Sequence, residues 1–378
     1  MLDLHLLKEE VKSYAKSIGI DKIRFTTAAP FEELKERLLE QQRLQYQSGF
    51  EEQDIEKRVN PSKLLKGAQS IIAIALAYPT KMTEKPKNTK ENRRGIFCRA
   101  SWGIDYHLIL KNRLEKLEQF LLEKFPEARC LSMVDTGALS DRAVAERAGI
   151  GFSGKNTSII TPEFGSYVYL GEMITTIPFA PDDPILDSCL DCTICINACP
   201  TGAIIQPHQL DSNRCIAFLT QTKEMLPDRF RKHLGNRIYG CDTCQQVCPK
   251  NKGIDFHFHE EMEAEPEKVK PLLKLLLTMS NREFKDTFGH MSGSWRGKKP
   301  IQRNAIMALA HYKDVSALPL LKELLLHDVR PVIRATAAWA IGEIQDDSMR
   351  TVLEEARKSE QEEIVQTEIN NAFKKLTT

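Results

Sequence analysis

The chain has 378 residues, of which 42% are hydrophobic, and this is enough for two or three domains with separate cores. Its 53 lysines and arginines are balanced by 52 aspartates and glutamates, so the composition excludes a protein whose whole surface is basic. Any surface for nucleic acid must come from local clustering of charge.

The N-terminal residues do not have the pattern of a signal peptide. The longest apolar run, from Ile71 to Tyr78, is shorter than the roughly 20 residues that cross a bilayer. We therefore expect a cytoplasmic protein. Cytosolic thiols are kept reduced, so the ten cysteines call for an explanation other than disulfides.

The first part of the chain is predicted to alternate between helices and strands. Leu4, Leu7 and Val11 have helical spacing, and residues 1–60 are predicted to be helical throughout. The further expected elements are a strand at 70–78, a surface loop at 80–94, a helix at 106–124, a strand at 131–134, a helix at 138–148 and a β-rich stretch at 166–177. The pattern predicts an α/β (α+β) domain over residues 1–180.

Eight of the ten cysteines lie between residues 189 and 248, in a segment predicted to form a second domain over residues 181–260. The first four follow the spacing C-x2-C-x2-C-x3-C-P, the run found in bacterial ferredoxins, whose fourth cysteine ligates the other cluster. A second run has the same ending, with its first cysteine displaced upstream to Cys215.

By pseudo-symmetry, two [4Fe–4S] clusters are expected. The first would be held by Cys189, Cys192, Cys195 and Cys248, and the second by Cys199, Cys215, Cys241 and Cys244. The alternative is a pair of structural zinc sites, but zinc needs neither an exchanged fourth cysteine nor the proline that follows each run. Two neighbouring clusters pass single electrons, so a terminal acceptor is expected in the first domain.

Residues 261–378 are predicted to form a helical domain with internal repeats. The pairs Ala308-Leu309, Ala340-Ile341 and Ala372-Phe373 recur every 32 residues, and Pro300 and Pro331 occupy corresponding helix starts. We interpret residues 300–378 as HEAT-like repeats, and the alternative is an ordinary bundle with alanine-rich faces.

Several motifs occur in one order along the whole chain: Arg99-Ala-Ser-Trp-Gly-Ile-Asp105-Tyr-His107, Val134-Asp-Thr-Gly137, Gly151-Phe-Ser-Gly-Lys-Asn-Thr-Ser158 and Phe164-Gly-Ser-Tyr-Val-Tyr-Leu-Gly-Glu172, followed by the ferredoxin run. In this the chain resembles the epoxyqueuosine reductase family. The resemblance implies a cobalamin-dependent enzyme, related to reductive dehalogenases, that reduces epoxyqueuosine to queuosine at the wobble position of tRNA. That reaction is the last step of queuosine biosynthesis.

The resemblance also implies roles for single residues. Asp135 would protonate the epoxide oxygen, which a carboxylic acid can do near neutral pH if burial raises its pKa. Turn or N-cap aspartates are common at such positions. The cobalamin site would include Arg58, Cys98, Asp135, Ser158 and Asp242. His107 is interpreted as an ordinary helix residue outside the site, because the resemblance implies cobalamin without a protein ligand to cobalt.

Two basic stretches are candidates for contact with tRNA, although charge runs are usually only solvated surface. Their residues are Lys223 and Arg231 in one stretch, and Arg296, Lys298, Lys299 and Arg303, beside Trp295, in the other. The expected partners are tRNA and a reduced flavodoxin- or ferredoxin-type protein, with the chain acting as a monomer. The alternatives are a reductive dehalogenase-like enzyme for a small molecule, a non-enzymatic electron-transfer subunit, and a nitroreductase-like flavoenzyme.

Overall fold

The computed structural model describes residues 3–376, which form two compact units. The first unit contains residues 3–81, 104–215 and 242–263, and the second contains the remaining described segments. Residues 1, 2, 377 and 378, at the outer limits of the first and third predicted domains, lie outside the described residues. The predicted limit near residue 180 falls inside the first unit, and the limit near 260 lies close to the end of that unit at residue 263. Segments 82–103 and 216–241 pack with the C-terminal helices.

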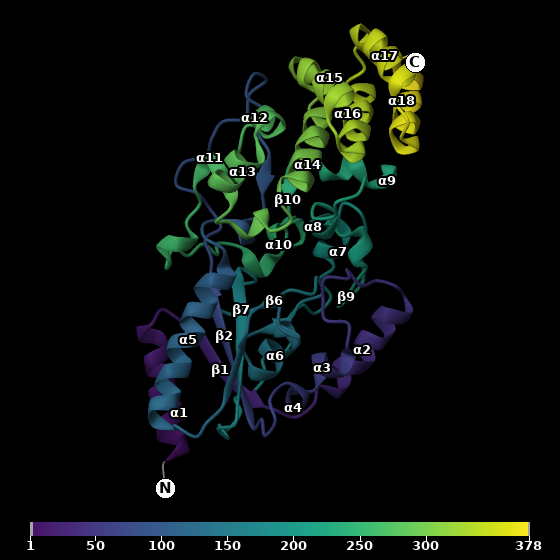
Figure 1. The fold of residues 1–378 in the computed structure, drawn as a ribbon. Coiled ribbons are helices and arrows are strands. Elements are labelled where there is room, and N and C mark those ends of the chain that lie inside the picture. Colours follow the sequence, from purple (N-terminus) through teal and green to yellow (C-terminus); the bar gives the residue numbers. More distant parts are fainter. Residues whose placement is uncertain (1–2, 377–378) are drawn as a thin grey trace. The chain divides into compact units, whose positions relative to one another are not determined.

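A four-stranded antiparallel sheet forms the centre of the first unit, with the strand order β1-β2-β7-β4. Its strands are β1 (Lys22–Thr27), β2 (Ser70–Ala77), β4 (Cys130–Met133) and β7 (Val168–Thr175). Helices α1 (Leu4–Ser17) and α5 (Tyr106–Lys124) cover one face, and α6 (Asp141–Ala148) covers the other (Figure 1). Every residue of β2 is buried, as expected for a strand covered on both faces.

The expected strands at 70–78, 131–134 and 166–177 and the expected helix at 106–124 are confirmed. The prediction that residues 1–60 are helical throughout was wrong, because β1 lies among them. β1 is an edge strand of only six residues. The two longer helices that flank it dominate the hydrophobic pattern of this part of the sequence, so the short alternation of the strand was not recognised.

The remaining elements of the first unit are short. The helices are α2 (Glu32–Arg43), α3 (Ile55–Val59), α4 (Pro61–Leu64), α7 (Ile194–Ala198) and α10 (Thr243–Gln246). The strands are β5 (Phe152–Ser153), β6 (Ile159–Ile160), β8 (Ile204–Gln206) and β9 (Gln209–Leu210), which pair as the antiparallel hairpins β5–β6 and β8–β9.

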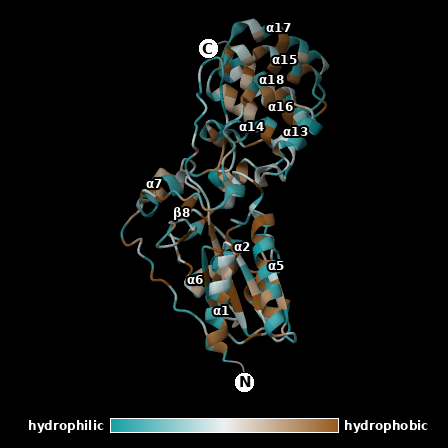
Figure 2. Ribbon diagram, turned by 90° about the vertical axis from the view of Figure 1, so that its left-hand side faces the viewer, coloured by the Kyte–Doolittle hydropathy of each residue, from teal (hydrophilic) through white to brown (hydrophobic). Residues whose placement is uncertain are grey.

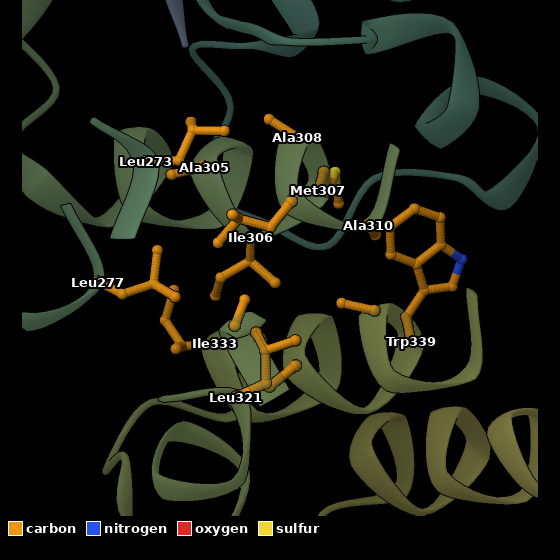
Figure 3. Close-up of a cluster of buried hydrophobic side chains, with 14 of the residues drawn as sticks. Leu273, Leu277, Ala305, Ile306, Met307, Ala308, Ala310, Leu321, Ile333 and Trp339 are labelled. Carbon is orange, nitrogen blue, oxygen red and sulfur yellow. The ribbon is translucent and has the colours of Figure 1, made fainter. Parts of the chain in front are cut away.

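Helices dominate the second unit, and the predicted repeats form its C-terminal part. They are α14 (Lys298–His311), α15 (Leu318–His327), α16 (Pro331–Ile344), α17 (Arg350–Ser359) and α18 (Glu363–Leu376). Ala308, Ala340 and Ala372 are buried at corresponding places on the three 14-residue helices. Close packing follows from these small residues: a Cβ atom added to Gly342 would lie 2.7 Å from the Cα atom of Ala372. Figure 3 shows part of the core, where Ile306 of α14, Leu321 of α15 and Ile333 of α16 gather.

A parallel pair of strands, β3 (Ile96–Phe97) and β10 (Arg237–Tyr239), packs against α14. The other helices of the second unit are α8 (Ile216–Leu219), α9 (Asp228–Arg231), α11 (Pro266–Val269), α12 (Leu273–Thr278) and α13 (Asn281–Phe288). In Figure 2, α1 and α5 each carry both hydrophobic and hydrophilic residues, as amphipathic helices do. Among residues 3–376, no helix combines the length and hydropathy needed to cross a membrane.

Candidate functional site

Asp135 lies on the loop between β4 and α6, in a backbone conformation that is unusual for a residue with a side chain. Its φ angle is 50°. Its backbone N–H donates to the Oδ2 atom of Asp141 at 2.7 Å, which ties the loop to the first residue of α6. Gly137 is required nearby, because a Cβ atom there would lie 2.5 Å from that of Met133. Strained backbone of this kind is concentrated at functional sites.

Two neighbouring side chains of α5 reach the carboxylate of Asp135. The hydroxyl of Tyr106 donates to Oδ2 of Asp135 at 3.0 Å, and the Nε2 atom of His107 lies 3.4 Å from the same oxygen. The other ring nitrogen of His107, Nδ1, lies 2.7 Å from Oδ1 of Asp105, which caps α5. His107 therefore sits between two carboxylates, and the Asp135 side chain remains 63% exposed, with neither contact using its Oδ1 atom.

These contacts decide where the proton resides. Burial opposes the charged imidazolium, but the hydrogen bond to Asp105 and the nearby carboxylate of Asp135 outweigh it and raise the pKa of His107 to about 9. The neighbouring His107 lowers the pKa of Asp135, although partial burial acts in the opposite direction. The condition that burial raises the pKa of Asp135 is therefore not met in this structure, because the ion pair with His107 dominates. At neutral pH the proton is on His107.

Sequence reasoning left His107 out of the site, and the structure brings it to Asp135. The signal that could have identified it is the Asp105-Tyr-His motif, since an N-cap carboxylate two residues before a histidine can bind its ring. Tyr106 is fixed by aromatic contacts, because it stacks on Tyr169 of β7 with ring centroids 4.5 Å apart and planes 5° apart. Tyr169 in turn contacts Tyr78 at the end of β2, with centroids 4.5 Å apart.

A cavity of about 720 Å³ opens in the first unit, within the range typical of cofactor sites. Its walls include the basic residues Arg37, Arg58, Arg142 and Arg147, together with apolar residues such as Leu34 and Leu38. Burial lowers the pKa of Arg58, whose charge is balanced in part by Glu51.

The cavity fits the chemistry of cobalamin, which carries a corrin ring, amide groups and a phosphate. The buried Nε atom of Arg147 has no hydrogen-bond partner among the described residues, so it offers a donor toward such groups. Its guanidinium otherwise donates to the backbone oxygens of Thr27, Ala29 and Pro30. The structure thus combines apolar walls with fixed donors, as a corrin would require.

Four other residues predicted to bind the cofactor, Asp135 among them, do not line this cavity. Ser158 lies next to Thr157, which does line it, and the Ser158 backbone N–H donates to Oδ1 of Asn156 at 3.2 Å. Asp242 is 8% exposed, and its backbone oxygen accepts hydrogen bonds from the backbone N–H groups of Gln245 and Gln246 at the start of α10. Cys98 belongs to the second unit, where its backbone N–H donates to the oxygen of Tyr239 and its Sγ atom lies against Gly240.

The arrangement of the cysteines agrees with an exchanged fourth ligand. Helices α7 and α10, which lie within the two cysteine runs and contain Cys195 and Cys244, pack against each other. Burial raises the pKa of the Cys189 and Cys195 thiols, and repulsion from Cys248 adds to the rise in both cases. Cys248 therefore lies close to the first run, although more than 50 residues separate them in sequence.

The remaining cysteines of the two runs have different surroundings. Burial acts to raise the pKa of Cys199, but backbone N–H groups outweigh it and lower the pKa, including that of Ala203, which donates to Sγ at 3.2 Å. Such N–H···S bonds are one way in which proteins tune cluster potentials. Cys215 and Cys244 also belong to the first unit, whereas Cys241 ends a segment of the second unit and packs against its core.

Two residues predicted to contact RNA are internal, so these predictions were wrong. Arg303 has 0% exposure, and its guanidinium donates to the backbone oxygens of Leu219, Thr222 and Glu224. Arg231 is 7% exposed and forms an ion pair with Glu368 at 2.8 Å. Both side chains stabilise the second unit from inside. A cluster of basic residues in the sequence does not show whether each side chain is buried in this way or exposed for RNA binding.

The other predicted RNA-binding residues are more accessible. Lys223 is exposed, and Lys299 is half-buried near the start of α14. Arg296 lies over the ring of the exposed Trp295, with its Cζ atom 5.0 Å from the centroid, and its Nε atom donates to the oxygen of Gln221. The Nζ atom of Lys298 donates to the oxygen of Met279, and burial lowers its pKa.

Family models match three parts of the chain. The model described as epoxyqueuosine reductase QueG, DUF1730, matches residues 58–136. The model of a 4Fe-4S double cluster binding domain matches residues 188–251, and a model of HEAT repeats matches residues 297–374. The iron–sulfur interpretation and the repeat interpretation are thereby confirmed over these ranges.

Relatives match over nearly the full length. The epoxyqueuosine reductase of Bacillus anthracis is 64% identical over 375 residues, which cover 99% of both chains. A crystal structure of epoxyqueuosine reductase with an epoxyqueuosine-modified tRNA-Tyr stem loop has 63% identity, covers 100% of both chains and gives a TM-score of 0.98. The Bacillus subtilis enzyme, in a structure with its catalytic aspartate loop swung out of the active site, has 63% identity, covers 99% of this chain and 100% of its own, and gives a TM-score of 0.97. The chain belongs to the epoxyqueuosine reductase family.

Proposed function

We propose that this chain reduces epoxyqueuosine to queuosine in the anticodon of tRNA, the last step of queuosine biosynthesis. The observation that carries the proposal is the acid formed by Asp105, His107 and Asp135 in a unit that also holds a cavity of about 720 Å³ and seven of the eight cluster cysteines. Removal of an epoxide oxygen needs electrons and protons together, and this arrangement provides for both.

Cobalamin, when bound, supplies the strongly reducing centre for this reaction. We propose that this cavity, which four arginines and four glutamates line, holds it, with Arg58, Arg142 and Arg147 as donors to its phosphate and amide groups. Apolar residues such as Leu34 and Leu38 would exclude water from the corrin. Asp135, Ser158, Asp242 and Cys98 remain proposed contacts, outside the residues that line this cavity.

The protein's own residues hold the proton. His107 is protonated at neutral pH, and Asp135 accepts from Tyr106 and pairs with His107 through one oxygen, Oδ2. The exposed Oδ1 of Asp135 is then the atom that can face a substrate. A proton that passes from His107 to Asp135 reaches the epoxide oxygen as its carbon–oxygen bond breaks, which is general acid catalysis.

The two cluster sets predicted above would carry the electrons, with Cys248 completing the first set and Cys199, Cys215, Cys241 and Cys244 forming the second. The proximity of Cys248 to Cys189 and Cys195 supports the exchange. We infer that a reduced flavodoxin- or ferredoxin-type protein supplies these electrons in the cytoplasm, and that the chain works as a monomer.

The tRNA would contact the second unit, where the predicted basic residues that remain accessible lie. Trp295, whose side chain is 53% exposed, offers an aromatic surface beside the guanidinium of Arg296, and Lys223 and Lys299 offer charges to phosphates. The target base would then leave the anticodon stack to reach Asp135, at a cost of a few kcal/mol or less in a loop.

The decisive experiment uses anaerobically reconstituted protein, with and without cobalamin, a chemical reductant, and tRNA that carries epoxyqueuosine. Digested nucleosides are then weighed by mass spectrometry. We expect loss of one oxygen only when cobalamin is present. An unchanged nucleoside, in a sample whose clusters and corrin are confirmed by absorption spectra, would overturn the proposal.

A further inference from the structure

Three exposed apolar side chains lie on the segment that carries the first cysteine run and have no part in the function described so far. Leu186, Leu190 and Ile194 are 87%, 80% and 46% exposed. Successive members are four positions apart, so the chain keeps their Cα atoms within about 14 Å of each other. Single exposed apolar residues need no explanation, but a concentration of them indicates a contact surface. We call these three residues the apolar patch.

Hydrogen bonds hold this segment in place, so the exposure does not come from a loose loop. The backbone N–H of Cys189 donates to Oδ1 of Asp187 at 2.7 Å, and the N–H of Cys192 donates to the backbone oxygen of Cys189 at 3.0 Å. The Nζ atom of Lys155 donates to the backbone oxygen of Leu190. An ordered backbone therefore presents the apolar side chains to solvent.

The conformation of Leu190 gives no reason for a leucine at this position. Its φ angle is 47°, in the left-handed region that favours glycine and is costly for a larger side chain. The side chain is mostly exposed, so it gains little from burial in return. Neither the backbone nor the core of the first unit requires a leucine here. A contact with another molecule explains it better.

The charges near the apolar patch are mainly negative. Residues 156–213 contain no lysine or arginine. The exposed acidic residues close to the patch in sequence are Asp183, Asp187 and Asp191. The four thiolates of a bound cluster add negative charge, and Lys155, Lys250 and Lys252 offset only part of the total. Such a surface repels the phosphates of a nucleic acid and attracts a protein with basic side chains.

The apolar patch also lies where electrons would enter the protein. In the proposed ligand sets, Cys189, Cys192 and Cys195 bind the first cluster, and Leu190 directly follows the first of these cysteines. Conversion of an epoxide to an alkene and water consumes two electrons and two protons. A one-electron donor therefore has to bind, transfer its electron and leave twice in each turnover. Electron-transfer complexes have small interfaces that suit such short encounters, and three apolar side chains fit that size.

We propose that the apolar patch is the docking surface of the protein that reduces the first cluster, an inference that rests on the function proposed above. The partner presents an apolar centre that covers Leu190 and its two neighbours, surrounded by lysines or arginines that face the aspartates. Each encounter oxidises the partner by one electron, which passes to the cluster. The surface thus narrows the flavodoxin- or ferredoxin-type donor to one with basic side chains around its redox group.

Binding of a basic one-electron protein tests the surface, and cytochrome c is the probe. Holoenzyme is titrated with oxidised cytochrome c in a calorimeter at low salt. Leu190→Ala should weaken binding by about 5- to 30-fold. Leu190→Gly should weaken it as much without lowering Tm, because glycine adopts a positive φ without strain. Leu6→Ala is the matched control, since Leu6 is 58% exposed on α1, outside the cysteine segment, and its replacement should leave the affinity unchanged.

Electron transfer to the same probe supplies a second measurement. A docking surface serves transfer in either direction, so chemically reduced holoenzyme is mixed with oxidised cytochrome c and followed by absorption. Leu190→Ala should slow this transfer by a similar factor, whereas the small oxidant ferricyanide should react equally fast with parent and variant. In the parent, the rate with cytochrome c should fall about tenfold or more between about 10 and about 300 mM salt, because opposite charges guide the encounter.

Several results would overturn the proposal. Equal affinities of the parent and Leu190→Ala for cytochrome c would do so, as would a transfer rate that salt does not change. Equal slowing with both oxidants would show that Leu190 supports the cluster and not docking. A parent dimer that Leu190→Ala dissociates in sedimentation would assign the apolar patch to a second copy of the chain. If the docking results hold while the parent leaves epoxyqueuosine unchanged, the proposed function fails and the docking surface remains.

Discussion

Replacing Arg303 by methionine should destabilise the second unit strongly. The side chain is wholly buried, and it donates to the backbone oxygens of Leu219, Thr222 and Glu224 at 2.7, 2.8 and 2.5 Å. It also donates to Oδ1 of Asn304. Burial lowers the pKa of Arg303 to about 9, so its guanidinium is still charged at neutral pH. Methionine keeps an unbranched stem and removes every donor.

The magnitude follows from the three carbonyl groups. A buried acceptor that loses its donor costs about 1–3 kcal/mol, and partial relaxation keeps the sum near the lower end, so we expect a loss of about 3–5 kcal/mol. For a domain of about 150–250 residues, 1 kcal/mol lowers Tm by about 2–4 °C. The transition of the second unit should therefore fall by about 10 °C.

The assay is thermal unfolding of the holoenzyme by calorimetry, combined with tRNA binding at two salt concentrations. Lys223→Met is the matched control, because Lys223 belongs to the other predicted basic stretch but is exposed. We expect its Tm to be unchanged and its tRNA affinity to be lower, with a weaker dependence on salt. If Arg303→Met kept the parent Tm but lost tRNA affinity, the structural role argued for Arg303 would be refuted.

Three further predictions concern the site. Asp135→Asn should lower the rate of product formation by about 100- to 10,000-fold with little change in Tm, as single-turnover kinetics would measure, and a rate within tenfold of the parent would contradict the role of Asp135 as proton donor. Asp105→Asn should lower the pKa of His107, measured by NMR titration of its ring. Because that pKa is about 9 in the folded protein and 6.5 ordinarily, the ion pairs should stabilise the fold fully below pH 6.5, and this stabilisation should disappear as the pH rises through 9; a titration near 6.5 in the parent would contradict this. Cys215→Ala should lower the bound iron by about half while the first cluster stays intact, as iron analysis and electron paramagnetic resonance would show, whereas full iron content would exclude Cys215 as a ligand.

The cysteine runs and the helical repeats could be predicted from sequence because both depend on spacing along the chain. The cluster chemistry fixes the intervals between Cys189 and Cys199, and the stacking of helices fixes the interval between Ala308 and Ala340. Such periodic constraints are local, and they remain visible without any knowledge of distant contacts.

The proton-handling residues could not be predicted in the same way, because long-range contacts determine their roles. His107 and Asp135 are 28 positions apart and meet only because α5 packs against the sheet of which β4 is the edge strand. For Arg303 the sequence was misleading. Its charge predicted an exposed, RNA-binding residue, whereas the carbonyl groups that hold it inside the protein lie about 80 residues away in the sequence.

The exchange of cysteines between the two runs has a consequence for biosynthesis. In the proposed ligand sets, the first cluster needs Cys248 and the second needs Cys241 and Cys244. The second set is complete only after residue 244 has been added and the first only after residue 248, although the central sheet needs only residues up to Thr175. The nascent chain can thus form its sheet well before all the cysteine ligands of either cluster have been synthesised. Maturation machinery that delivers clusters would therefore meet a chain whose first unit is largely folded, and a prematurely terminated product would carry no fully ligated cluster.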